Sequence, residues 1–547
     1  MTITEASQVG DEVKGESPST ISGATGSQRV AVRLRKPYET DVEQRFRLTD
    51  PSKGLELSKN KHVRRVLKNR KFQFFLILPN QIVFWGVIFL GILGTVNPDL
   101  NFATAITWFL WFALVFVMMV VVGRAWCVMC PFGGFAEWIQ RKSFWNRTQK
   151  ALGLGRKFPE SIAKYGLITS VGTFLLLTWL EEFFNIAGPG NPEATSIMVI
   201  GIVISAVTFF MVFERRTFCR YVCPLSALIG SVGAAGTAAG FRTKDRDKCL
   251  NCKTKECMRG GDEGFGCPWY TWPGSADSNL TCGLCSECYK ACPSDNVGFF
   301  IQKPLTSMIA PLRRRADVAW SVLLLWGLVV FQQFNAVSLY GTIDNWLNTK
   351  MHFPQYPNPV DYIGIIFLVT LIMAGIAWVG SKAMKKDAVQ LDLSGSPVNF
   401  AGAKASSKTI KHSFVDKKSQ FRSFMLPLSY GLIPVVGADY FARQLPKFFL
   451  NVLKLVPDVG AWFGIGGGTN AKLFNAEILS GNQIVAVQVG VIIVGMLASL
   501  YAMRKIIKRD IVPFATSPFA TKLVAYGTVL ACGVGASWLY VMMHAAT

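Results

Sequence analysis

The sequence predicts an α-helical polytopic membrane protein of about nine spans, with a small α+β domain inserted between its helices. Three observations lead to this prediction. Hydrophobic residues make up 51% of the 547 residues and charged residues only 17%, and the apolar residues gather in long runs such as 103–122 and 363–379. Lysine and arginine cluster at the ends of alternate runs. One polar stretch, 249–292, holds eight of the thirteen cysteines.

The hydrophobic runs are expected to form membrane-spanning helices. A helix of about 20 residues crosses the hydrocarbon core of a bilayer, because each residue adds about 1.5 Å of rise. The expected helices lie near 76–97, 103–122, 162–182, 195–213, 318–338, 360–380, 423–438, 483–503 and 521–543. The run near 423–438 is short and contains Pro427 and Pro434, which neighbouring helices can accommodate. Residues 439–481 are expected to form an interfacial amphipathic segment on the outer face.

The distribution of lysine and arginine predicts the orientation. One set of loops carries most of the basic residues, among them Arg64, Lys71, Arg141, Arg215, Arg313, Lys382 and Arg504. The opposite loops are poorer in basic charge and include Asp99, Glu181, Glu193 and Asp344. Cytoplasmic loops carry an excess of lysine and arginine, so the first set is expected to face the cytoplasm of a bacterium, inside its inner membrane. This bias accounts for the formal charge of +23, and nucleic acid is not an expected partner.

Composition divides the chain into four expected domains. Residues 1–70 read as a basic, largely disordered cytoplasmic tail, and they lack the apolar region of a cleaved secretory signal. Residues 71–240 form a membrane domain, 241–305 a cysteine-rich domain, and 306–547 a C-terminal membrane domain.

The second half of the cysteine-rich domain contains the most specific motif of the chain. It reads Cys282-x2-Cys285-x2-Cys288-x3-Cys292-Pro293, the run of bacterial ferredoxins. Short gaps let three thiolates converge on one iron–sulfur cube, and the proline directs the fourth cysteine toward a second cluster. This domain is therefore predicted to be an inserted α+β bacterial two-[4Fe–4S] ferredoxin-like domain on the cytoplasmic side.

A looser cysteine run precedes it and completes the eight thiolates that two clusters need. It reads Cys249-x2-Cys252-x4-Cys257-x9-Cys267-Pro268. The ferredoxin crossing rule assigns one cluster to Cys249, Cys252, Cys257 and Cys292, and the other to Cys282, Cys285, Cys288 and Cys267. The alternatives are a zinc site or disulfides. Zinc commonly takes two pairs across a long spacer, and disulfides are disfavoured on a cytoplasmic loop.

Two further cysteine pairs each follow a hydrophobic run. Cys127-x2-Cys130-Pro131 and Cys219-x3-Cys223-Pro224 have similar settings, with basic and aromatic residues around the pair and small residues after the proline. The settings indicate a duplication of helix pairs over about 76–140 and 162–230. Four thiolates at one membrane depth could hold a third [4Fe–4S] cluster, bind copper or another metal, or cycle as dithiols. They could also be packed as small apolar residues, the expected role of Cys532.

The sequence contains little that indicates other cofactors. There is no Cys-x-x-Cys-His motif, and the four histidines are His62, His352, His412 and His544, so no haem is expected. A quinone is a possible partner, although the sequence contains no quinone-binding motif. Its candidate proton-handling groups are Asn80, Gln81, Glu137 and Glu214. Basic residues of the ferredoxin-like domain are candidates for docking an acidic redox partner: Lys244, Arg246, Lys248, Lys253 and Lys255.

The combination of helices that end in Cys-Pro motifs with a paired ferredoxin run resembles the NapH/NosR/CcoG group of membrane polyferredoxins. The resemblance covers about 70–305. It is carried by the cysteine spacing and by Gly123-Arg124-Ala125-Trp126-Cys127 and Arg220-Tyr221-Val222-Cys223-Pro224-Leu225. The chain differs from NosR-like members, which have a flavin domain, and from CcoG-like members, which end in a soluble domain. NapH-like members are shorter and lack helices that correspond to those after residue 310 of this chain.

The resemblance implies electron transfer between a quinone pool or a cytoplasmic donor and a partner reductase or maturation pathway. The first hypothesis is therefore a membrane iron–sulfur protein that relays electrons between a quinone pool or membrane partner and a redox protein. Such a chain is an electron-transfer subunit of an oxidoreductase complex. The alternative is an assembly factor that reduces copper at Cys127, Cys130, Cys219 and Cys223 to mature another enzyme.

Overall fold

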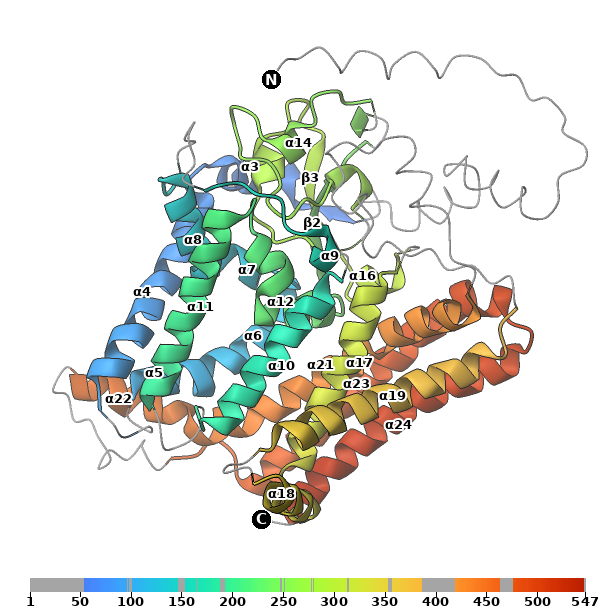
Figure 1. Cartoon of the computed structure of the whole chain (residues 1–547). Coiled ribbons are helices and arrows are strands. Elements are labelled where there is room, and N and C mark those ends of the chain that lie inside the picture. The colour runs from blue at the N-terminus through green and yellow to red at the C-terminus, as the bar shows by residue number, and fades with distance from the viewer. Residues whose placement is uncertain are drawn as a thin grey trace, which may run out of the picture. The chain divides into compact units, whose positions relative to one another are not determined.

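A computed structural model gives the arrangement of the chain. It describes residues 54–95, 97, 101–145, 153–163, 165–186, 192–245, 248–249, 251–276, 278, 280–311, 314–352, 357–385, 419–462 and 476–545. The described residues are mostly helical and include one three-stranded sheet (Figure 1).

The first repeat of the membrane domain is built from one long helix, one composite helix and two short ones. They are α4 (Phe72–Leu93), the continuous α5 (Phe102–Thr104), η4 (Ala105–Trp111) and α6 (Phe112–Val122), then α7 (Trp126–Met129) and α8 (Pro131–Arg141). The two long helices lie where the hydrophobic runs predict them, shifted by a few residues.

The second repeat follows the same plan. It comprises α9 (Glu160–Ala163), α10 (Leu167–Phe183), α11 (Pro192–Val212), η5 (Phe218–Val222) and α12 (Pro224–Val232). The two repeats pack together, because α4 and α8 of the first repeat both contact α11 of the second. Within the second repeat, α12 packs against α10. A short helix that begins directly after a cysteine thus ends each repeat in the interior of the molecule.

The ferredoxin-like domain is framed by an antiparallel sheet in the order β1-β3-β2. Its elements are β1 (Leu55–Glu56), η2 (Leu57–Lys59), α3 (Lys61–Lys68), β2 (Ala238–Thr243), α14 (Glu256–Arg259), η6 (Pro273–Ser275), α15 (Glu287–Lys290) and β3 (Val297–Gln302). Strand β2 pairs with β3 over its whole length, with Phe241 opposite Phe299. The two strands close the segment that carries the eight cysteines.

The tail expected over 1–70 is corrected at its C-terminal end. Strand β1 pairs with β3, with Leu55 opposite Ile301. Helix α3 is held by Arg64 and Lys68, which form ion pairs with Asp295 at 3.0 and 2.9 Å. Residues 54–70 therefore belong to the ferredoxin-like domain, whereas 1–53 lie outside the described residues.

The C-terminal part is a bundle of long helices. After α16 (Thr306–Ile309) it comprises α17 (Ala316–Phe334), α18 (Ser338–Met351), α19 (Pro359–Ser381), α21 (Gln420–Asn451), η8 (Val452–Lys454), α22 (Leu455–Trp462), α23 (Gly481–Ile506), η10 (Ile507–Ile511), η11 (Val512–Phe514) and α24 (Pro518–Ala545). Helix α21 packs against α17, α19 and α23, and it also contacts α6, η4 and α12 of the first membrane domain.

Helix α21 corrects the expectation for 439–481. Residues 439–451 continue a buried helix of 32 residues instead of lying along an interface. Its three internal prolines are accommodated by neighbours, since the N–H of Val435, next to Pro434, donates to Ser499 Oγ at 3.0 Å. Residues 463–475 of the expected segment lie outside the described residues.

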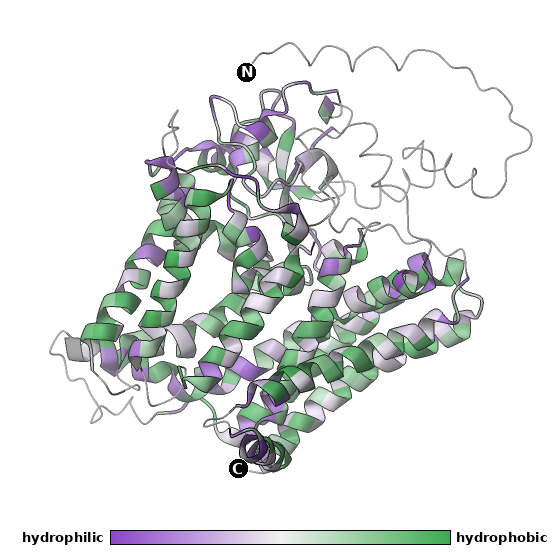
Figure 2. Ribbon diagram, viewed as in Figure 1, coloured by the Kyte–Doolittle hydropathy of each residue, from purple (hydrophilic) through white to green (hydrophobic). Residues whose placement is uncertain are grey.

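Eight helices of the described chain are long and apolar enough to cross a membrane. They are Phe72–Leu93, Phe102–Val122, Glu193–Val212, Ala316–Phe334, Pro359–Ser381, Gln420–Gly460, Gly481–Phe514 and Pro518–His544. The ninth expected helix is α10, which has 17 residues where a span needs about 20. Figure 2 shows hydrophobic colour along these helices and more hydrophilic colour around the β-strands. The chain is therefore a membrane protein by its helices.

Candidate metal centres

The second cysteine of each membrane pair caps a helix. Cys130 is the N-cap of α8 and Cys223 is the N-cap of α12, each followed by a proline at the first helical position. Proline is suited to that position because its fixed φ matches the helix and no N–H is needed there. The backbone N–H groups of Phe132 and Gly133 act to lower the pKa of Cys130, although they do not form a cap hydrogen bond to its sulfur. The N–H groups of Leu225 and Ser226 act on the pKa of Cys223 in the same way. Both thiols thus sit where a helix N-terminus favours negative charge.

The two pairs converge although their spacings differ. Cys127 lies in the α-helical turn α7, whereas Cys219 lies in the π-helical turn η5. A π-turn accommodates one more residue per turn than an α-turn, and such turns are frequent at functional sites. The extra residue of the second pair is therefore absorbed within η5, and both pairs present two thiols to the same side.

All four membrane cysteines border one cavity of about 180 Å³. Their charges would act on one another, because Cys127, Cys130 and Cys223 each raise the pKa of Cys219. Burial is the larger cause of that rise, and it also raises the pKa of Cys130 to about 11 and that of Cys223 to about 12. Thiols in this environment stay protonated unless a metal displaces the proton.

Two buried arginines border the four cysteines. Arg124 donates to the carbonyl of Leu280 and to Ser226 Oγ, and Arg216 donates to the carbonyl of Cys127 at 3.1 Å. Arg216, 1% exposed, also holds Glu137 Oε2 at 2.6 and 3.1 Å through Nη2 and Nε. Burial would lower the pKa of Arg216, but the charge of Glu137 raises it, as would the smaller effects of thiolates at Cys219 and Cys285. Arg216 therefore lies within electrostatic reach of the membrane cysteines and of the ferredoxin run.

Glu137 is the counter-ion of this cluster. It pairs with Arg141, four residues along α8, as well as with Arg216. Burial would raise its pKa, but the charges of Arg141 and Arg216 outweigh burial and lower the pKa below its usual value. Glu137 is thus an ionised structural anchor for Arg216, and it is not placed as the proton-handling group that the sequence suggested.

In the ferredoxin-like domain, the structure brings together the first predicted set of four. Cys249, Cys252, Cys257 and Cys292 border one small cavity. Thr243 Oγ1 lies 3.0 Å from Cys249 Sγ, and Asn296 donates to Cys249 Sγ from its side chain and to Cys292 Sγ from its backbone, both at 3.3 Å. Hydrogen bonds to cysteine sulfur are one of the levers that set the potential of an iron–sulfur cluster.

The second predicted set of four is also brought together. Each of Cys267, Cys282 and Cys285 would raise the pKa of Cys288, in addition to the larger effect of burial. The backbone N–H of Thr271 donates to Cys267 Sγ at 3.3 Å. The loop around Cys285 is strained, because Leu284 and Ser286 both have positive φ, 54° and 60°. Cys292 thus lies with the first set and Cys267 with the second, and the crossed assignment of ligands stays a prediction.

Trp269 connects the ferredoxin-like domain to the membrane site. It follows Cys267-Pro268 in the chain, and it borders the same cavity as the four membrane cysteines. The guanidinium carbon of Arg124 lies 4.5 Å from the centroid of its ring and that of Arg216 lies 5.9 Å away. A side chain at Gly283 would collide with the indole, since a Cβ there would lie 2.1 Å from Trp269 Nε1.

The cavity extends from the cysteines to a group of charged residues from α10 and α21. Its lining there includes Glu181 of α10 and Arg443 and Lys447 of α21. Lys447 lies 3.8 Å from Glu181, and Arg443 lies 3.4 Å from Glu182. Between the two ends the walls are apolar and largely aromatic: Trp108, Trp111, Phe112, Phe116, Phe174 and Tyr440.

The other candidate residues are scattered. Asn80 borders the cavity, Gln81 is buried in α4, and Glu214 accepts a hydrogen bond from Tyr270 at 2.9 Å. Of the basic docking candidates, Lys244 pairs with Glu56 and Asp295, Lys248 with Asp245, and Lys255 lies over Trp272. Lys253 is exposed, and Arg246 lies outside the described residues. Cys532 is buried in α24, away from the twelve grouped cysteines.

Sequence reasoning missed Arg124, Arg216 and Trp269. A signal for the arginines was present, because each lies three residues before the first cysteine of its pair. For Trp269 the only local signal is its place after Cys267-Pro268. The cavity residues of α21 had no signal, since their partners in α10 are about 260 residues away.

The cysteine sets can be tested for their fit to [4Fe–4S] clusters. A cluster needs four thiolates spread over four irons, N–H donors to sulfur, and shielding from water, and each set offers four thiols with such donors. All thirteen cysteines are free thiols. Within the described residues, no three His, Cys, Asp or Glu side chains converge closely enough to share one metal ion. Four cysteine thiolates, each on a different iron, are the usual ligands of a [4Fe–4S] cluster, and each set offers four cysteines.

Comparison with known proteins bears on the membrane repeats. The chain matches the family model described as a 4Fe-4S binding domain over residues 104–153 and 194–236. No curated protein and no solved structure matches the chain. The first matched segment contains Cys127 and Cys130, and the second contains Cys219 and Cys223. The match supports an iron–sulfur, ferredoxin-like protein, and it falls on the two repeats that carry the membrane cysteines.

Proposed function

We propose that this protein is a membrane-bound electron-transfer protein that holds three [4Fe–4S] clusters. It relays electrons between a quinone or another membrane partner and a redox protein that docks on the ferredoxin-like domain. The observation that carries the proposal is the shared cavity, which is bordered by Cys127, Cys130, Cys219 and Cys223 and by Trp269. The membrane cysteines and Trp269 of the ferredoxin-like domain thus line the same cavity.

The three centres form a sequence from surface to membrane. The cluster bound by Cys249, Cys252, Cys257 and Cys292 is the outermost in this proposal, since Cys252 and Cys292 lie beside the exposed hydroxyl groups of Thr254 and Ser294. The set of Cys267 is more buried, and Trp269 links it to the membrane set. When bound, [4Fe–4S] clusters accept and donate single electrons. The chain itself supplies the thiolates, the N–H donors, and the arginines that compensate negative charge.

The membrane partner is proposed to bind in the cavity. A site for an apolar ligand is typically a concave surface of hydrophobic and aromatic side chains with a few polar groups that fix orientation. The cavity has this character, with aromatic walls between the cysteines and the charges of Glu181, Arg443 and Lys447. A quinone combines an apolar body with polar oxygens and suits such a lining.

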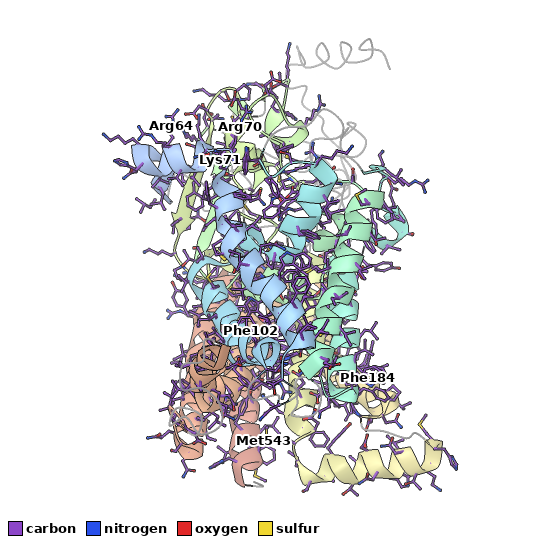
Figure 3. All side chains as sticks on the ribbon, turned by 90° about the vertical axis from the view of Figure 1, so that its left-hand side faces the viewer. Arg64, Arg70, Lys71, Phe102, Phe184 and Met543 are labelled. Atoms are coloured by element: carbon purple, nitrogen blue, oxygen red, sulfur yellow. The ribbon has the colours of Figure 1, made fainter. Side chains whose placement is uncertain are left out.

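The clusters are proposed to face the cytoplasm of a bacterium. Figure 3 shows Arg64, Arg70 and Lys71 together at the end of α4 next to the ferredoxin-like domain, with Met543 far from them. Basic residues at this end of the helices support the positive-inside orientation. The resemblance to NapH/NosR/CcoG-type polyferredoxins supports the same assignment.

Iron content and spectroscopy of the purified protein test the proposal. Three clusters give about twelve iron atoms and as many acid-labile sulfides, whereas two give about eight. Cys127→Ala is expected to remove about four of the twelve and one paramagnetic signal of the reduced protein. If instead wild type holds about eight iron atoms and copper that Cys127→Ala releases, the copper-reducing assembly factor replaces the relay.

A further inference from the structure

A carboxyl group is buried in the middle of the C-terminal bundle. Asp439 lies on α21 inside a membrane-spanning segment and is 0% exposed. Gln333 of α17, also 0% exposed, donates from Nε2 to Asp439 Oδ1. Tyr540 of α24 donates from its hydroxyl to the backbone carbonyl of Asp439 at 3.3 Å. Three helices therefore meet at this one side chain.

No ion pair compensates Asp439 within the described residues. The nearest cation along α21 is Arg443, which donates to the carbonyl of Gln332 at 2.6 Å and to Glu182 at 3.4 Å. The other polar or titratable groups around Asp439 are Tyr540 and Cys532 of α24, Gln333 of α17 and Tyr440 of its own helix. An ionised carboxylate at membrane depth without a cation is costly, and such groups neutralise instead.

The hydrogen bonds around Asp439 are one proton short. Asp439 Oδ2 and Gln333 Oε1 are both buried, and neither accepts a hydrogen bond of regular geometry from the described residues. The Tyr540 hydroxyl lies near both side chains, but its hydrogen bond goes to the backbone carbonyl of Asp439. Both side-chain oxygens are acceptors as long as Asp439 is ionised. A proton on Oδ2 turns that oxygen into a donor, and a carboxylic acid and an amide can then exchange two hydrogen bonds. One proton thus gives both oxygens a hydrogen bond, and burying a polar atom without one is unfavourable.

We propose that Asp439 is a proton-binding site inside the membrane, with the proton held between its carboxyl group and the amide of Gln333. The site lies beside the cavity, since Gln332, Tyr440 and Arg443 border the cavity and are neighbours of Gln333 and Asp439 in their helices. This inference goes beyond electron relay, because it gives the C-terminal helices a role in proton handling near the membrane centre.

Infrared spectroscopy of the holoprotein in lipid nanodiscs tests the site. The wild type shows a carboxylic-acid C=O band at neutral pH that Asp439→Asn removes. The matched control Gln333→Leu keeps the band and shifts it to higher frequency, because the acid loses its amide partner. A wild-type spectrum without such a band overturns the proposal. A band that appears only when sodium is withdrawn also overturns it, in favour of a cation site.

Thermal unfolding gives a second readout. Asparagine carries two N–H donors in the shape of the protonated acid, so Asp439→Asn is expected to leave the midpoint close to that of wild type. Asp439→Leu leaves both polar groups of Gln333 unpaired and lowers the midpoint. If Asp439→Asn is as damaging as Asp439→Leu, the native group is ionised and the proposal fails. Iron content and the paramagnetic signals stay unchanged in every variant, so this outcome is separate from that of the electron relay.

Discussion

A buried arginine precedes each membrane cysteine pair by three residues, Arg124 before Cys127 and Arg216 before Cys219. Four thiolates make a cluster site anionic, and each added electron makes it more so. A guanidinium in a low-dielectric site favours the reduced state, because Coulombic attraction is stronger there than in water. Each repeat of the membrane domain therefore carries both a cysteine pair and an arginine that can compensate the negative charge of a cluster.

Arg216→Gln is expected to lower the reduction potentials of the membrane centre and of the cluster at Cys285, because it removes a positive charge shared by both. Arg216→Lys keeps the positive charge, so both reduction potentials should stay close to those of wild type. Redox titration monitored by electron paramagnetic resonance measures both. Equal shifts in the two variants would instead assign the effect to the lost hydrogen bond to the carbonyl of Cys127.

The same substitution has a structural cost. Breaking a buried ion pair from one side typically destabilises by about 3–5 kcal/mol, since the remaining charge is left uncompensated. Glu137 retains Arg141 after Arg216→Gln, so a loss at or below the lower end of that range is expected. Thermal unfolding of Arg216→Gln and of the double variant with Glu137→Gln measures the loss. The double variant should be no more stable than Arg216→Gln, because it also removes the ion pair between Glu137 and Arg141.

Among the elements, the π-turn η5 decides whether the second cysteine pair can meet the first. Deletion of Tyr221 makes the second spacing equal to that of Cys127 and Cys130. The turn then becomes α-helical, and Cys219 rotates about 100° relative to Cys223. We expect iron to fall from about twelve to about eight atoms while both ferredoxin-type clusters persist. A retained third signal would show that η5 is not needed to position Cys219.

The element β1 and the turn after it complete the ferredoxin-like domain. Ser58 Oγ accepts the N–H of Phe299 at 3.1 Å, and Asn60 caps α3 through the N–H of His62 at 2.9 Å. Deletion of residues 1–60 removes these contacts next to β3. We expect it to cost the cluster at Cys249 and about four iron atoms. Deletion of 1–53 is the matched control and should retain all iron, as counted after purification.

Across the whole molecule, prediction from sequence succeeded where structure is encoded locally. Hydrophobic runs are short-range signals, and eight of the nine expected helices are long and apolar enough to cross a membrane. Cysteine spacing is equally local, and the ligand sets that it indicates stay predictions. Long-range contacts were out of reach. Residues 54–70 read as a polar tail because only pairing with β3, about 245 residues away, orders them. In α21, prolines and charges obscured a buried helix whose partners, such as Ser499 and Glu181, lie far along the chain.

The arrangement of the three centres predicts the order in which they are lost to oxygen. Cys252 and Cys292 lie next to hydroxyl groups at the surface, Thr254 and Ser294, so the outermost cluster is the most accessible. Cys267, Cys285 and Cys288 are buried, and the partly buried cysteines of the membrane set border the apolar cavity and not a surface loop. Limited air exposure should therefore remove about four iron atoms first, with loss of one paramagnetic signal.

Variants identify which signal disappears. Cys252→Ser should lack the signal that is lost first in wild type, and its remaining iron should resist the same exposure. Cys127→Ala should lose the same first signal as wild type, because its outer cluster is intact. If air attacks the membrane signal first, the cavity between Trp269 and Lys447 admits oxygen more readily than the surface loop does. The sequence of centres from surface to membrane would then not govern their stability.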